Sequence, residues 1–149
     1  MNLKLLMILL VALGDSSAST FVKDKLYYFE TYYKASWFKA LMACGKMGME
    51  LLSIDSDAEF DKIHALVKDK VEYKEGLMIW TSAAMKEIGQ FNWIYTGNPV
   101  EVSKWLSDQP NNFGKNEFCM HIWLYNKQFV LNDIRCDTEA HFICESWKV

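Results

Sequence analysis

Several features of familiar functional classes are missing from the 149-residue sequence. Positive charge is not in excess, because 16 Lys and Arg residues stand against 19 Asp and Glu, for a net charge of −3. This balance argues against nucleic-acid binding, which needs a basic face. No Gly-x-Ser-x-Gly, His-Glu-x-x-His or phosphate-loop signature occurs, so the common enzyme motifs are missing and we do not expect an enzyme. No Asn-x-Ser/Thr acceptor occurs either, and N-glycosylation is not expected.

Long apolar runs are also scarce. The longest, Leu5 to Leu13, follows Lys4 and precedes the small and polar stretch Gly14 to Ser19. A bilayer span takes roughly 20 apolar residues, so this run is too short, and its pattern is typical of a secretory signal peptide. A buried N-terminal helix is the alternative. We predict a signal peptide over residues 1–18, cleaved after Gly14 or Ala18, no membrane span, and a secreted, extracellular protein.

The remaining chain, residues 19–149, has the length of one domain, and a hydrophobic fraction of 51% is enough for a core. No repeat, linker or low-complexity tract divides it. Four cysteines in a secreted chain indicate disulfides. They allow three connectivities, and the spacing does not choose between them.

Hydrophobic periodicity predicts two helices. After Ser36, a plausible N-cap, apolar residues from Trp37 to Met47 recur at helical spacing. Ser56 and Glu59 form a capping-box pattern ahead of a helix with Phe60, Ile63 and Val67 on one face. Alternating or continuous apolar runs predict strands around residues 26–29, 77–82, 89–95, 119–125, 128–131 and 141–145. We place Trp123, which lies between Ile122 and Leu124, in the core.

The stretch from Trp105 to Cys136 carries the candidate site. It contains Gln109-Pro110-Asn111, then Glu117 before Cys119, then Asn132-Asp133 before Cys136. Amide and carboxylate oxygens on a loop, without His or thiolate ligands, suit a hard cation such as calcium. If the bond before Pro110 is cis, the side chains on either side of it can point the same way.

These motifs resemble those of the C-type lectin family. Its members carry Glu-Pro-Asn or Gln-Pro-Asp, a Glu two residues before a Cys, and Trp-Asn-Asp before another Cys. Here Gln109-Pro110-Asn111 is a hybrid of the two tripeptides, and Leu131 replaces the usual Trp. The resemblance covers nearly all of the chain after residue 25. It implies an α+β C-type lectin-like fold with two helices, two small antiparallel sheets, a long ligand-binding loop, and the disulfides Cys44–Cys144 and Cys119–Cys136.

The resemblance also implies the site chemistry. The calcium ligands it implies are Gln109, Asn111, Glu117, Asn132 and Asp133, with the Asp133 carbonyl as a sixth oxygen. Sugar hydroxyls complete the coordination shell, and the residues that contact carbohydrate are Gln109, Asn111, Glu117, Asn132 and Phe113. Phe113 either stacks on a sugar ring or packs inward.

The ligand set predicts one weak calcium site. Only Glu117 and Asp133 are anionic, and ligand charge tunes calcium affinity. The acidic positions of the family's auxiliary calcium site fall near Ala84, Ile88 and Asn112, which carry no carboxylate. Because Gln109 and Asn111 both turn N–H groups toward the sugar, we also expect loose sugar selection.

Three functions remain at this point. The first is calcium-dependent binding of glycans on cell or microbial surfaces, as in innate immunity. The second is a C-type lectin-like protein with a degenerate site, which binds a protein partner without calcium. The third, an enzyme using Glu117 and Asp133 as a hydrolase pair, is disfavoured because both are better explained as calcium ligands. No heptads or collagen-like repeats precede the domain, so a homo-oligomer would have to form through surface contacts.

Overall fold

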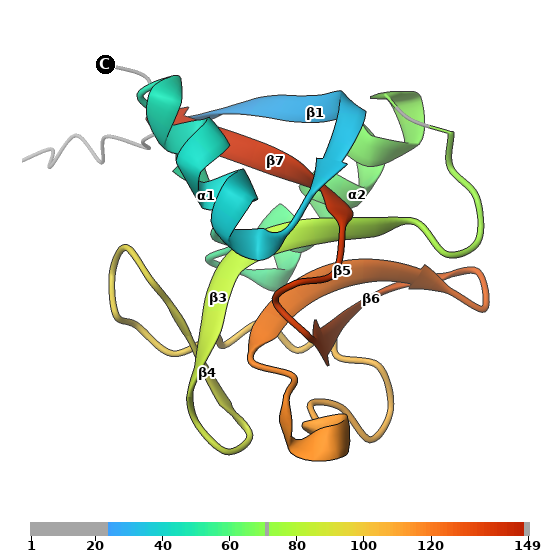
Figure 1. Ribbon diagram of the computed structural model, residues 1–149. Helices are drawn as coiled ribbons and strands as arrows, with labels where there is room; N and C mark the ends of the chain where they lie inside the picture. Colours follow the sequence, from blue (N-terminus) through green and yellow to red (C-terminus); the bar gives the residue numbers. More distant parts are fainter. Residues whose placement is uncertain (1–23, 71, 148–149) are drawn as a thin grey trace, which may run out of the picture.

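The computed structural model describes residues 24–70 and 72–147 (Figure 1). The predicted signal peptide lies outside the described residues. In chain order, the elements are β1 (Lys25–Ala35), α1 (Trp37–Lys46), β2 (Glu50–Leu51), α2 (Asp57–Lys70), β3 (Met78–Glu87), β4 (Gln90–Trp93), the 3-10 turn η1 (Phe113–Lys115), β5 (Cys119–Tyr125), β6 (Gln128–Ile134) and β7 (Ala140–Trp147).

The strands form one mixed sheet instead of the two small antiparallel sheets that we expected. Its order is β1-β7-β3-β5-β6, with β2 paired to β7 and β4 paired to β3. The two antiparallel parts are joined by a short parallel pairing of β3 with β7, in which Ile79 faces His141 and Trp80 faces Phe142. Figure 1 shows α1 beside β1 and β7 at one end of the molecule, and the loop that carries η1 at the other end.

Helix α1 forms as the periodicity predicts. Its buried side chains are Trp37, Ala40 and Cys44, which lie on one face at helical spacing. Ser36 occupies the N-cap position but makes no side-chain capping hydrogen bond. The helix ends before Gly48, whose φ of 68° is a left-handed conformation that glycine adopts without a steric penalty.

Helix α2 begins with a capping box, but the Glu59 side chain binds the backbone one residue before the position that we predicted. The Ser56 hydroxyl accepts a hydrogen bond from the Glu59 backbone N–H at 3.1 Å, as expected. The Glu59 carboxylate, however, accepts from the backbone N–H of Asp55 at 2.7 Å. Phe60, Ile63 and Val67 are buried, which confirms the predicted inner face.

The two disulfides are Cys44–Cys144 and Cys119–Cys136, the pairing that the resemblance implied. The first ties α1 to β7, and the second joins the start of β5 to the segment after β6. The placement of Trp123 in the core is wrong, because its side chain is only partly buried and lies against Tyr125, with the ring centroids 4.4 Å apart and the rings tilted by 31°. In a strand, Trp123 points to the opposite face from Ile122 and Leu124, which are part of the core.

The buried ammonium group of Lys25 connects the first strand of the domain with the last. Lys25 Nζ lies 2.9 Å from Glu59 Oε1 and 3.4 Å from Glu145 Oε2, and it donates to the Ser53 carbonyl at 2.8 Å. The Lys25 side chain is 6% exposed. These contacts link β1, α2 and β7. Among the described residues, no helix combines the length and apolar character needed to cross a membrane.

Candidate functional site

The loop between β4 and β5 is fastened to the body of the domain at its base. Leu131 of β6 donates its N–H to the Lys104 carbonyl at 2.8 Å and accepts from the Leu106 N–H at 2.9 Å. Trp105 between them packs against Phe91, with ring centroids 5.6 Å apart. Leu131 itself is fully buried, so the residue that replaces the family's Trp still serves as a core contact.

A second contact between the loop and the body of the domain lies just before Trp105. The Asp57 carboxylate at the start of α2 accepts hydrogen bonds from both the backbone N–H and the hydroxyl of Ser103. These bonds hold the pKa of Asp57 below its ordinary value. Contacts within the protein therefore order the loop, and they place both of its arms at the candidate site in a defined position.

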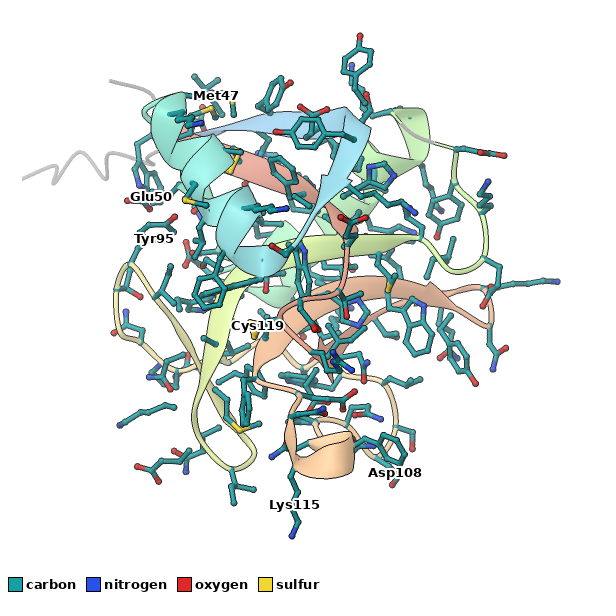
Figure 2. All side chains as sticks on the ribbon, in the orientation of Figure 1. Met47, Glu50, Tyr95, Asp108, Lys115 and Cys119 are labelled. Atoms are coloured by element: carbon teal, nitrogen blue, oxygen red, sulfur yellow. A yellow bond between two sulfur atoms is a disulfide. The ribbon has the colours of Figure 1, made fainter. Side chains whose placement is uncertain are left out.

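The Gln109–Pro110 peptide bond is cis, which is the geometry that the sequence argument required for the flanking side chains. Asn112, with a φ of 47°, follows in a left-handed conformation. In Figure 2, Asp108 and Lys115 lie at the outer tip of this loop, far from Met47 and Glu50, and Cys119 lies between the two groups.

The Asp133 carboxylate binds the loop directly. This side chain is fully buried on β6. One carboxylate oxygen accepts the backbone N–H of Asn111 at 3.2 Å, and the other accepts that of Asn112 at 2.7 Å. The strand motif and the tripeptide motif, which are far apart in the sequence, are thereby brought into contact.

Glu117 approaches the same place from the other arm of the loop. Its carboxylate accepts the Phe113 backbone N–H at 2.9 Å, and its own backbone N–H donates to Asn112 Oδ1 at 3.0 Å. Burial raises the pKa of Glu117, the Phe113 bond opposes this shift, and the charge of Asp133 adds to it. The negative charge of Asp133 therefore disfavours the ionised form of Glu117.

Two amide oxygens in this region have no hydrogen-bond partner. Gln109 Oε1 and Asn132 Oδ1 are buried and unpaired among the described residues. A buried polar atom left without a partner costs about 1–3 kcal/mol, so native structures rarely leave one without a reason. A bound cation would satisfy both oxygens, and oxygen donors of this kind are what calcium prefers.

The candidate oxygen donors in this region are mostly amides. Within the described part of the chain, no group of three or more such side chains could hold a metal ion. Here only Glu117 and Asp133 are acidic, and the other candidate donors are amides. A hollow of about 550 Å³ between β1 and α1, lined by residues such as Met42 and Phe142, lies at the other end of the molecule and shares no residue with this loop.

Phe113 points into solvent, with 78% of its surface exposed. Of the two orientations left open by the sequence, the structure has the outward one. Phe118, directly after Glu117, is also exposed at 48% and was not identified from the sequence. Its position next to Glu117, a candidate calcium ligand, is the only feature of the sequence that could have indicated it.

Two further residues escaped the sequence analysis. Asn112 was considered only as a lost acidic position, but its backbone N–H and side-chain oxygen connect Asp133 to Glu117. His121 on β5 is 1% exposed, and its Nε2 lies 3.2 Å from Asn132 Nδ2. Burial lowers the pKa of His121 to about 3, so its ring is neutral near physiological pH.

Comparisons with known proteins identify the family of the chain. The family description Lectin C-type domain matches residues 33–146. Salivary C-type lectin 2 of Aedes albopictus is 38% identical over 121 residues, which are 76% of this chain and 79% of the relative.

Solved structures of the same fold are also similar. The mouse scavenger receptor C-type lectin carbohydrate-recognition domain has a TM-score of 0.70 at 28% identity and covers 85% of this chain and 91% of its own. The C-type lectin domain of murine dendritic cell inhibitory receptor 2, solved in complex with an N-glycan, has a TM-score of 0.73 at 26% identity, with 86% and 94% covered. The chain belongs to the C-type lectin family of non-enzymatic, carbohydrate-binding proteins.

Proposed function

We propose that this protein is a secreted lectin that binds carbohydrate through a calcium ion held by the loop between β4 and β5. One observation carries the proposal. The unpaired oxygens Gln109 Oε1 and Asn132 Oδ1 occur in the same part of the fold as the Glu117 and Asp133 carboxylates, which repel each other. Within the described residues, these four oxygen-bearing side chains have no ion pair with a Lys, Arg or His side chain, and such oxygens are the donors that calcium prefers.

The ligands in this proposal are Gln109, Asn111, Glu117, Asn132 and Asp133. Asp133 can serve while it holds the loop, because a carboxylate offers about four lone-pair sites and only two accept N–H groups here. Calcium, when bound, supplies the positive centre on which neighbouring sugar hydroxyls are held. The protein's own part is to orient those hydroxyls.

Selection among sugars then depends on the donors and acceptors around the cation. Asn111 Oδ1 accepts the Phe113 backbone N–H, which leaves the Asn111 amide nitrogen free to donate to a ligand. Glu117 is the anionic acceptor for a hydroxyl proton. A hydroxyl that meets only donors loses on the order of 1–3 kcal/mol of discrimination, so we expect looser selection than in either standard tripeptide.

Secretion and a single weak cation site belong to the same proposal. Two disulfides suit an oxidising compartment, and relatives named salivary lectins support export. Two anionic ligands place the calcium affinity at the weak end of the range for extracellular modules, about 10⁻⁴–10⁻³ M.

A calcium titration followed by tryptophan fluorescence tests the cation, and a glycan array run with calcium and with chelator tests the sugar. We expect a saturable fluorescence change that chelator reverses, because Trp105 packs at the base of the loop. Asp133→Asn should abolish both signals. Asp137→Asn makes the same chemical change on an exposed side chain that pairs with Arg135, and it should preserve both. Glycan binding that is equal with and without chelator would refute the calcium mechanism.

An alternative function is binding of a protein partner at the same loop face without calcium. The hybrid tripeptide and the replacement of Trp by Leu131 favour it, because both depart from the family's sugar-binding pattern. The same titration separates the two functions. A protein of the second kind would give no calcium-dependent fluorescence change and no glycan signal under either condition.

A further inference from the structure

His121 and Asn132 face each other across neighbouring strands. They are a register pair of β5 and β6, so their side chains lie on the same face of the sheet. Both are buried, at 1% and 8% exposed. Asn132 Nδ2 lies 3.2 Å from His121 Nε2 and 2.7 Å from the backbone carbonyl of Asp133.

The Asp133 carbonyl fixes which way the Asn132 amide points. A carbonyl oxygen can only accept, so the atom 2.7 Å away must be the amide nitrogen and not the amide oxygen. The second amide hydrogen is then directed at His121 Nε2, which must accept it and therefore carries no proton. The ring proton is therefore on Nδ1, the other ring nitrogen.

We infer that His121 is a positioning residue for Asn132: it holds the amide with Oδ1 directed to the cation site and leaves neither amide N–H for a sugar hydroxyl. This inference rests on the proposed function. It also revises the sequence-based expectation, in which Asn132 donated to the hydroxyl near Glu117. That hydroxyl is then offered only an acceptor, the Glu117 carboxylate. The amide donors available to a sugar come from Gln109 and Asn111.

A purely structural role is the competing explanation, because His121 also contacts aromatic rings. Its ring centroid lies 6.1 Å from that of Trp80 and 5.9 Å from that of Trp123. A packing role depends on volume and predicts that variants of similar size behave alike. A positioning role depends on one acceptor atom at one place.

Two polar variants separate these explanations. The side-chain oxygen of His121→Gln can replace Nε2, whereas the shorter side chain of His121→Asn places its oxygen near Nδ1 and leaves Asn132 without its acceptor. We expect calcium affinity, measured by calorimetry, to be close to wild type in His121→Gln and roughly fivefold to tenfold weaker in His121→Asn, the loss of one orienting hydrogen bond. Calcium affinities that differ by less than twofold between the two variants, at matched thermal stability, would overturn the inference.

A measurement on the wild-type protein needs no variant to fold. Long-range ¹H–¹⁵N correlation spectra of calcium-free protein report the His121 tautomer, and we expect the proton on Nδ1, with Asn132 side-chain amide protons that exchange slowly. A proton on Nε2 would refute the positioning role even if calcium binds. Conversely, the expected tautomer in a protein that fails to bind calcium would sink the proposed function and leave the Asn132 orientation standing.

Discussion

Replacing Gln109 with glutamate tests the cation site through the protein's stability. The substitution keeps the shape of the side chain and puts a carboxylate where the structure has a buried, unpaired amide oxygen. Without calcium, this third carboxylate repels Glu117 and Asp133, and we expect a loss on the order of 1–3 kcal/mol in the free energy of unfolding. With calcium, the site carries three negative charges in place of two, so affinity rises.

The size of the effect follows from linkage. If the wild-type Kd is about 1 mM, 10 mM calcium stabilises the fold by about 1.4 kcal/mol, and a tenfold tighter site stabilises it by about 2.7 kcal/mol. A domain of this length moves by roughly 4 °C per kcal/mol. The calcium-induced rise in Tm should therefore increase from about 6 °C in the wild type to about 11 °C in Gln109→Glu.

Thermal unfolding of both proteins in 10 mM calcium and in chelator gives the two shifts. Gln128→Glu is the matched control, because Gln128 is exposed at the turn between β5 and β6 and the charge change is the same. A glycan array with the variant should show a changed sugar preference, because a carboxylate at position 109 accepts a hydroxyl proton where the amide nitrogen donates one. Equal calcium-induced shifts in wild type and Gln109→Glu would show that this side chain does not touch the ion.

Three other outcomes follow from the structure. Phe113→Ala should weaken glycan binding severalfold with the free energy of unfolding unchanged within about 0.5 kcal/mol, because the ring is 78% exposed beside the loop; Tyr32→Ala, 92% exposed at the other end, should leave binding intact. Lys25→Met should cost about 1–3 kcal/mol in denaturant unfolding, because Glu59 and the Ser53 carbonyl lose a buried donor, whereas Lys74→Met, at an exposed pair, should cost almost nothing. Burial raises the pKa of Glu145 from 4.5 to about 8, so between these pH values the folded state keeps a proton that the unfolded state loses. The free energy of unfolding should therefore fall as pH rises through this window. Glu145→Gln should flatten this pH profile, and a wild-type profile that is already flat there would contradict the assignment.

Local patterns in the sequence predicted the elements but not the connection between the two halves of the sheet. Helical spacing from Trp37 to Cys44 and around Phe60 was enough to identify both helices, because periodicity depends only on near neighbours. The parallel pairing of Ile79 with His141 joins distant segments, and no local pattern encodes it. Trp123 was misplaced because three consecutive apolar residues hide which face of a strand is solvated.

The site could be predicted to a similar depth. Residue types and spacing indicated the oxygen donors, since those donors follow the family's motifs in chain order. Asn112 and His121 act through contacts with other elements, in one case a register pair between strands. Their roles become visible only when the register and the loop conformation are known.

The contacts that hold the loop in shape are largely separate from the oxygen atoms that are left for a cation. Ser103 is fixed by Asp57, Trp105 by Phe91, and the tripeptide by Asp133, all through contacts within the protein. A cation therefore has little ordering of the backbone to bring about, and its affinity depends mainly on the charge and orientation of the donors around it. If the proposed function holds, the scaffold contacts determine whether a site exists, while Gln109 and the Asn132–His121 pair determine how strongly and how selectively it binds. Loss of Asp133, a residue of both classes, should therefore disturb the loop contacts as well as the proposed cation site.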